Sequence, residues 1–275
     1  MTVVLTGAAG KVATAMRPYL LRAGIELRLS DLRKPDEIHT GETFVPADLS
    51  DPDAARDLLA GATAVVHFAG HPRDADWPTL EPANITACYN VFDAARTQGL
   101  ERVIFASSNH ATGYRRTGDI HDSQTAPRPD SLYGVTKVFG EALTTVFADK
   151  HGLATLALRI GHVADRPVDQ RRLSIWLHPE DLSQLVLIGL RHPTICGQIL
   201  TAVSGTSRPY ADMADATALG YQPRHHADNH RPPEDPPNKD PVASAFQGGS
   251  VAANGFDGDL NRTLAAVALR PGKHS

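Results

Sequence analysis

Residues 1–13, M-T-V-V-L-T-G-A-A-G-K-V-A, decide the fold of this chain. The residues at positions 2–5 are β-branched or aliphatic, which predicts a buried strand. Gly7, Gly10 and Ala13 then follow at even spacing, and a helical pattern continues to Leu21. The stretch therefore predicts a strand, a glycine-rich turn and a helix in immediate succession.

This turn has the chemistry of a dinucleotide-binding site. Glycines let the backbone turn tightly and approach a pyrophosphate, and a small residue at Ala13 lets the helix pack against the strand. The helix N-terminus favours the negative charge of the phosphates. A G-x-x-G pattern alone is weak, but its place directly after the first strand favours this function over an ordinary loop. We expect the cofactor contacts of the turn to come from Gly7, Ala9, Gly10, Lys11 and Val12.

An acidic residue follows the second predicted strand, residues 25–29. Asp31 stands roughly twenty residues beyond the turn, where a carboxylate accepts hydrogen bonds from the adenosine ribose. This position favours NAD over NADP because a carboxylate repels a 2′-phosphate, although Arg33 could accept one. The alternative role for Asp31 is to cap a helix or turn.

Strands and helices continue to alternate along the chain. We expect strands at residues 44–45, 62–70 and 102–106, a helix after Asp51, and a long helix from Asn84 to Gly99. This alternation requires parallel pairing with right-handed crossovers, so the predicted fold class is α/β, a doubly wound parallel sheet or Rossmann fold. Its ligand crevice lies at the carboxyl ends of the strands. Further cofactor contacts are expected there from Leu32, Asp48, Leu49, Phe68, Ala69, Gly70 and Asn84.

Three further features lie near the predicted cofactor residues. Asp48 contacts the adenine or caps the following helix. His67 lies inside a uniformly apolar run, so we interpret it as a core histidine with its hydrogen bonds satisfied. The proline- and charge-rich loop of residues 71–82 is expected to form a pocket rim.

The second part of the chain has weaker signals. We expect a sixth strand at residues 154–161, a helix at 178–193, a seventh strand at 198–203 and a short surface helix at 210–219. Residues 1–161 are predicted to form the dinucleotide-binding core. Residues 162–275 supply the remaining sheet elements, substrate-binding segments and, from residue 223, an irregular tail that wraps the domain and is partly disordered at its terminus. The whole is effectively one domain.

The stretch from Ser107 to Lys137 carries the predicted chemistry. Ser108 follows the fifth strand, and Tyr133 and Lys137 are four residues apart on one face of a helix that starts near Tyr133. A tyrosine is a poor base at neutral pH, but a lysine ammonium one turn away favours its phenolate. Tyr133 can then remove a hydroxyl proton while hydride leaves the same carbon, and Ser108 holds the substrate oxygen. A lone Y-x-x-x-K is common by chance, whereas its combination with the glycine turn and Asp31 predicts a dehydrogenase.

The chain resembles the extended short-chain dehydrogenase/reductases, the NAD-dependent epimerase/dehydratase superfamily, over nearly its whole length. T-G-A-A-G, the Asp-Leu pairs at 31–32 and 48–49 and Y-G-V-T-K carry this resemblance. Within the superfamily it is similar to the NAD-dependent uronate dehydrogenases. The narrower motifs are F-A-S-S-N-H (105–110) followed by Gly113-Tyr114, R-P-D-S-L-Y-G (128–134), K-x-F-G-E (137–141), L-R-I-G (158–161), R-x-L-S-x-W (171–176) and F-Q-G-G (246–249).

The resemblance implies a reaction and a set of roles. Uronate dehydrogenases oxidise the C1 hydroxyl of glucuronate or galacturonate to an aldarolactone and produce NADH. When the roles in that family are carried over to this chain, Tyr133 is the base and Lys137 is its partner. Both also contact the cofactor, together with Ser107 and Ile160. Ser108, Asn109 and His110 bind sugar hydroxyls. Arg171 pairs with the uronate carboxylate, for which a guanidinium fork is suited, although spacing alone favours a solvated surface arginine.

Two departures from the uronate dehydrogenase pattern fall in the substrate pocket. Pro72 and His162 each stand where those enzymes usually have a serine. With Arg73, they could recognise a different anion or a differently shaped sugar. The alternatives are a dehydrogenase or epimerase of the same superfamily that acts on another sugar, sugar nucleotide or biosynthetic intermediate, and a non-catalytic NAD(P)-sensing protein.

The composition of the chain argues against several kinds of partner and site. A net charge of −4, without clusters of Lys and Arg, argues against nucleic acid as a partner. Cys88 and Cys196 are far apart, so we expect two buried thiols and no disulfide framework. His225, His226 and His230 have no neighbouring carboxylates or cysteines in a rigid frame, so no metal site is expected. Without a signal sequence or a long apolar run, we expect a cytoplasmic homo-oligomer that acts on a small polar substrate and not at a membrane.

Overall fold

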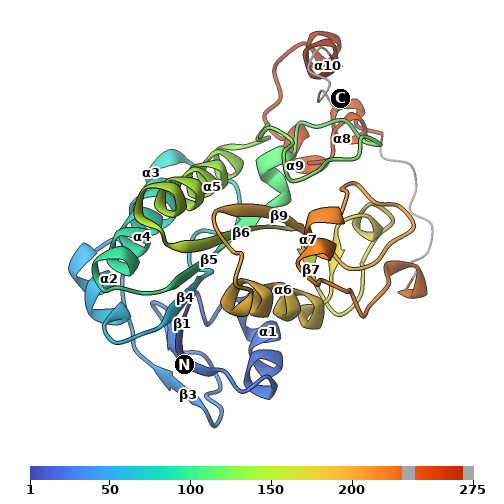
Figure 1. The fold of residues 1–275 in the computed structure, drawn as a ribbon. Coiled ribbons are helices and arrows are strands. Elements are labelled where there is room, and N and C mark those ends of the chain that lie inside the picture. The colour runs from blue at the N-terminus through green and yellow to red at the C-terminus, as the bar shows by residue number, and fades with distance from the viewer. Residues whose placement is uncertain (231–238, 269–275) are drawn as a thin grey trace.

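Seven parallel strands form the centre of the protein (Figure 1). The structure, a computed structural model, describes residues 1–230 and 239–268. The strand order is β3-β2-β1-β4-β5-β6-β9, so the direction of winding reverses between β1 and β4, where such sheets bind their ligands. The predicted doubly wound α/β fold is confirmed. The strands are β1 (Thr2–Thr6), β2 (Glu26–Ser30), β3 (Glu42–Phe44), β4 (Ala64–His67), β5 (Arg102–Ser108), β6 (Ala154–Ile160) and β9 (Gln198–Ala202).

Helices cover both faces of the sheet, which explains why its strands are apolar throughout (Figure 1). One face packs against α1 (Lys11–Arg22) and α6 (Pro179–Arg191). The other packs against α2 (Pro52–Leu59), α4 (Ala87–Thr97) and α5 (Leu132–His151).

The segment before Asn84 is helical earlier than the sequence predicts. α3 (Trp77–Leu80) and a π-helical turn, η1 (Glu81–Thr86), run directly into α4, so the expected loop at 71–82 ends at Asp76. The Asp76 carboxylate caps α3 by accepting a hydrogen bond from the Thr79 amide, and Pro78 fits the first helical turn. The proline that we interpreted as a loop signal therefore marks a helix start.

Short elements after β6 build the region beside the carboxyl end of the sheet. A two-stranded sheet pairs β7 (His162–Val163) with β8 (Trp176–Leu177), and the turn η3 (Arg171–Leu173) precedes β8. The surface helix predicted at 210–219 is shorter, α7 (Ala214–Ala218). Tyr210 lies outside it and is buried, because the backbone around it pairs with that around His121.

The tail after residue 223 is more regular than predicted. It contains η4 (Ala227–His230), α8 (Pro241–Ala245), α9 (Ser250–Ala253) and α10 (Leu260–Ala268). Asp240 caps α8, and Phe246 packs edge-on against Tyr114 with 5.1 Å between ring centroids. The disorder predicted for the terminus concerns residues outside those described. Among the described helices, none has the length and apolar character needed to cross a membrane.

The turn between β1 and α1 brings two strand ends into close contact. Gly7 has φ +67°, and a Cβ atom there would lie 2.6 Å from the carbonyl carbon of Phe68. The Thr6 hydroxyl accepts hydrogen bonds from the amides of Phe68 and Ala69, each at 3.1 Å. The bare backbone at Gly7 is therefore required both by its conformation and by the approach of the chain that follows β4.

We expect Gly7→Ala to destabilise the protein more than Gly24→Ala, as measured by urea unfolding. Gly24 also has a positive φ, +76°, but has no heavy atom within 4 Å of a Cβ position. Its substitution carries the backbone cost alone, about 1–2 kcal/mol. Gly7→Ala adds a steric clash of about 1–3 kcal/mol. Equal losses in the two variants would show that the contact with Phe68 is not a constraint.

Candidate active site

The carboxyl end of β5 holds the serines predicted for the site. Ser107 and Ser108 are the last residues of β5, in register with Arg159 and Ile160 of β6. The Ser108 hydroxyl accepts a hydrogen bond from the His110 amide at 3.2 Å and caps the turn η2 (Asn109–Thr112). The strand end thus presents Ser108, Asn109 and His110 next to one another, where the sequence placed them.

The start of α5 brings Tyr133 and Lys137 to the same strand end. Ser131 caps the helix by accepting a hydrogen bond from the Gly134 amide at 3.0 Å. Lys137 is buried, its Nζ donates to the Ala106 carbonyl of β5 at 2.9 Å, and it lies 5.4 Å from the centre of the Tyr133 ring. Tyr133 in turn lies edge-on to His110, with 6.0 Å between ring centroids. The predicted meeting of tyrosine, lysine and the end of β5 is therefore present.

Asp130 is a site residue that sequence reasoning did not single out. Its side chain is fully buried, and its Oδ2 lies 2.8 Å from His110 Nδ1. Its Oδ1 accepts a hydrogen bond from the Ser131 hydroxyl, which caps α5. Asp130 thus connects the orientation of His110 to the start of the helix that carries Tyr133. A carboxylate directly before a capping serine was the available signal.

A buried ion pair lies behind the serines. Glu141 accepts hydrogen bonds from Arg159 Nε at 2.8 Å, from Arg159 Nη2 at 2.9 Å and from the Ser107 hydroxyl at 2.6 Å. Both charged side chains are almost wholly buried. Glu141 ends the K-x-F-G-E motif, but its partner Arg159 on β6 lies in a different motif, and the pairing was missed.

Two of the predicted cofactor residues, Asp31 and Asp48, make contacts within the protein. Asp31 Oδ2 accepts a hydrogen bond from the Ala9 amide at 3.0 Å, and its Oδ1 accepts one from Leu32 at 2.8 Å. Asp31 therefore caps the turn, and its contact with a ribose stays a prediction. Asp48 binds the amide and hydroxyl of Ser50, which hold its pKa below the usual range, and it does not cap α2. Asp51 caps that helix instead.

The turn fits a dinucleotide on its own geometry. Gly10 occupies the N-cap of α1 without a capping side chain, and the first helical turn has no acidic residue. The amides that start α1 are thus open to an anion.

Two buried residues near β4 are held by contacts within the protein. Asn84 accepts a hydrogen bond from the His71 amide at 2.6 Å and donates one to the Thr136 hydroxyl at 3.0 Å, so it joins the loop after β4 to α5. Its predicted cofactor contact is untested. His67 is buried, and its Nδ1 lies 2.8 Å from the Thr6 hydroxyl. Burial lowers the pKa of His67 to about 3, which confirms a neutral core histidine.

The predicted substrate residues come from two loops. Pro72 and Arg73 are exposed on the loop after β4. This loop is connected to α5 because Asp74 Oδ1 accepts a hydrogen bond from the Tyr133 amide at 3.1 Å. His162 is half-buried at the start of β7. Burial, and then the nearby charges of Arg172 and Arg171, lower its pKa, so the imidazole is neutral at pH 7.

Arg171 contacts the C-terminal motif F-Q-G-G. Its Nη2 donates to the Gln247 carbonyl at 2.5 Å. A Cβ at Gly249 would lie 2.5 Å from Arg171 Nε, and Gly249 has φ +62°. Arg171 is exposed, as spacing alone favoured, and its side chain is held in place by the C-terminal segment.

A cluster of titratable groups lies away from this site. Among the described residues, His178, Glu180 and His225 place ligand atoms within 4.8 Å of one another. Glu180 already pairs with Arg224 and His225, and the rings of His178 and His225 stack with 3.5 Å between centroids. His178 Nδ1 accepts the Glu180 amide and caps α6. Stacked parallel rings cannot both direct a lone pair at one ion, so these contacts describe a helix cap.

The cysteines differ from one another. Cys88 is buried, and burial raises the pKa of its thiol to about 12. Cys196 is exposed, so its predicted burial is wrong. It lies in the turn between α6 and β9, which apolar patterning did not resolve.

Comparisons with known proteins identify the family. The model of the NAD dependent epimerase/dehydratase family matches residues 3–173, and the chain belongs to this family. Uronate dehydrogenase of Pseudomonas syringae pv. tomato is 34% identical over 260 residues, which cover 93% of this chain and 94% of that protein. NAD-dependent glucose-6-phosphate dehydrogenase of Haloferax volcanii is 34% identical over 244 residues, 81% of this chain and 92% of that protein.

A solved structure of a uronate dehydrogenase is also similar to this chain. A variant of uronate dehydrogenase from Agrobacterium tumefaciens, in complex with NAD, matches with a TM-score of 0.85 and 32% identity. The match covers 92% of this chain and 97% of that chain. The family and these relatives support NAD as the cofactor.

We expect Glu141→Leu to lower the free energy of unfolding by about 3–5 kcal/mol, because it leaves Arg159 buried without its counterion. The double variant Glu141→Leu/Arg159→Met removes both charges and should be more stable than Glu141→Leu alone. Urea unfolding of the four proteins in this cycle measures the coupling. If the losses of stability in Glu141→Leu and in Arg159→Met simply add in the double variant, the ion pair does not stabilise this site.

Proposed function

We propose that this protein oxidises the C1 hydroxyl of a uronic acid, glucuronate or galacturonate, to an aldarolactone with NAD. The observation that carries the proposal is the meeting of Ser108, Tyr133 and Lys137 at the end of β5, beside the turn that fits a dinucleotide. The near full-length similarity to uronate dehydrogenases supports the choice of substrate.

Each catalytic residue has a distinct role in this proposal. Ser108 donates a hydrogen bond to the C1 oxygen, and Tyr133 removes the C1 hydroxyl proton. The Lys137 ammonium, 5.4 Å from the tyrosine ring, favours the phenolate form that accepts this proton. NAD, when bound, supplies the acceptor for the hydride from C1. As the C1–H and O–H bonds break, C1 and its oxygen form the lactone carbonyl.

The cofactor is held by backbone amides and by Asp31. Amides at the start of α1 face the pyrophosphate, and Asp31 accepts hydrogen bonds from the ribose hydroxyls while it continues to cap the turn. The full proposed set is Gly7, Ala9, Gly10, Lys11, Val12, Asp31, Leu32, Asp48, Leu49, Phe68, Ala69, Gly70, Asn84, Ser107, Tyr133, Lys137 and Ile160.

The sugar is bound on the other side of Tyr133. Asn109 and His110 bind ring hydroxyls, and Asp130 fixes the His110 ring, because its Oδ2 lies 2.8 Å from Nδ1. Arg171 pairs with the carboxylate. Pro72, Arg73 and His162 line the pocket where uronate dehydrogenases usually have two serines and so adjust the shape of the sugar that fits.

With NAD, we expect glucuronate and galacturonate to give the highest kcat/KM in a panel of uronic acids, aldoses, sugar phosphates and sugar nucleotides. The kcat/KM for aldoses without a carboxylate should be lower by about tenfold or more, since these sugars lose a hydrogen bond to a charged group. The measurement is the absorbance of the reduced cofactor. Turnover of glucose 6-phosphate or a sugar nucleotide, with none of the uronates, would reject the proposed substrate but not the mechanism.

Tyr133→Phe should lower kcat by about 10²–10⁴, because it removes the proton acceptor and leaves the ring in place. NAD affinity, measured by calorimetry, should stay close to that of the wild type. Tyr89→Phe is the matched control, because Tyr89 is 49% exposed on α4, and it should keep full activity. Full activity in Tyr133→Phe would remove Tyr133 from its role.

A further inference from the structure

Tyr210 is a buried residue whose hydroxyl has no hydrogen-bond partner among the described residues. The residue is only 7% exposed. Leaving a buried hydroxyl without a partner costs stability, so such a group calls for a functional explanation. His121 Nε2 is a second such atom, and the two rings lie edge to face with 5.9 Å between centroids.

The backbone holds Tyr210 firmly in this position. The His121 amide donates to the Tyr210 carbonyl at 3.0 Å, and the Asp212 amide donates to the His121 carbonyl at 2.5 Å. The ring packs in an apolar cluster with Ile175 and Val203. These contacts fix the ring without satisfying its hydroxyl.

Tyr210 lies beside the substrate side of the proposed site. The carbonyl of its neighbour Ile175 accepts a hydrogen bond from the His162 amide at 2.6 Å, at the start of β7. The guanidinium groups of Arg159 and Arg171 are close enough to act on the Tyr210 hydroxyl electrostatically. Burial, the largest influence, raises the pKa of Tyr210, so the hydroxyl keeps its proton at neutral pH and can donate it in a hydrogen bond.

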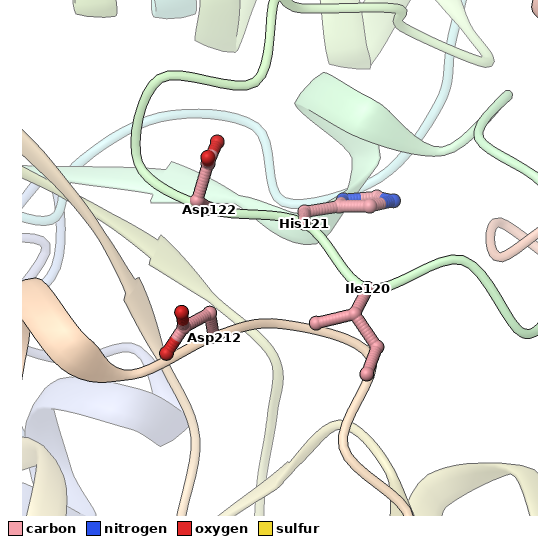
Figure 2. Close-up of a pocket in the computed structure, with 4 residues that line it drawn as sticks. All are labelled: Ile120, His121, Asp122 and Asp212. Carbon is pink, nitrogen blue, oxygen red and sulfur yellow. The ribbon is translucent and has the colours of Figure 1, made fainter. Parts of the chain in front are cut away.

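A neighbouring surface pocket does not account for these atoms. It has a volume of about 320 Å³ and is lined by Ile120, His121, Asp122 and Asp212 (Figure 2). The two aspartates give this pocket an acidic wall, which disfavours an anion. Figure 2 shows the His121 ring pointing away from both carboxylates. Burial, and then the nearby charges of Arg115 and Arg159, lower the pKa of His121 to about 4, so it is neutral at pH 7.

We propose that the Tyr210 hydroxyl donates a hydrogen bond to the carboxylate of the substrate, next to Arg171. A carboxylate has about four acceptor positions and a guanidinium fork fills two of them, which leaves room for a neutral donor. Tyr210 then supplies a hydroxyl in a pocket where His162 has replaced a serine. This inference rests on the proposed oxidation of a uronate.

Tyr210→Phe tests the inference because it removes only the hydroxyl. We expect KM for glucuronate and galacturonate to rise about tenfold or more, with kcat within about twofold of the wild type. The thermal midpoint of the free protein should stay unchanged or rise, because the variant loses a buried polar group that had no partner. If Tyr210 had only a structural role, the variant would lose thermal stability and keep the KM of the wild type.

Tyr221→Phe is the matched control. Tyr221 is also buried, but its hydroxyl donates to the Val203 carbonyl at 2.7 Å. This variant should lose thermal stability and keep the KM of the wild type. If the wild type is active and Tyr210→Phe has an unchanged KM, the inference about Tyr210 is wrong but the proposed function is not. An ordered water would then be the partner of the Tyr210 hydroxyl. A wild type that turns over no uronate would instead overturn the proposed function itself.

Discussion

The site depends on Lys137, a buried cation that binds a carbonyl and not a carboxylate. Its ammonium donates to the Ala106 carbonyl and lies 5.2 Å from the centre of the Phe105 ring. Among the described residues, no carboxylate forms an ion pair with it. Burial of a charge without a counterion costs stability, so the arrangement is expected only where the charge has a use. Here the charge lies 5.4 Å from the centre of the Tyr133 ring, the proton acceptor of the proposed reaction.

The nearby ion pair of Glu141 and Arg159 makes this arrangement possible. Glu141 is one helical turn beyond Lys137 and is the obvious carboxylate to neutralise it. Arg159 instead binds both carboxylate oxygens of Glu141, and the Ser107 hydroxyl binds one of them. The charge of Lys137 is thus left to act on Tyr133. The ion pair thus connects α5 to β6 and occupies the carboxylate nearest to Lys137 along the helix.

The sequence predicts the parts of the structure that are encoded locally. Apolar runs predict the central strands, and the spacing of Tyr133 and Lys137 predicts that they share a helix face. Contacts between distant segments could not be predicted in this way. Tyr210 was assigned to a surface helix because its burial depends on backbone pairing with His121, far away in the chain. Asp130 was overlooked because its partner, His110, belongs to another motif.

The same chemistry can serve several sugars, so the residues around Tyr133 decide what this protein oxidises. In the proposed site, His110, Arg171 and Tyr210 supply polar groups to the sugar, and Pro72 and His162 set the shape of the pocket. The most direct measurement of the central claim uses glucuronate labelled with deuterium at C1, with NAD as acceptor. We expect the deuterium to appear in the reduced cofactor and the labelled sugar to react more slowly. Deuterium that stays in the sugar product or is lost to water would contradict it.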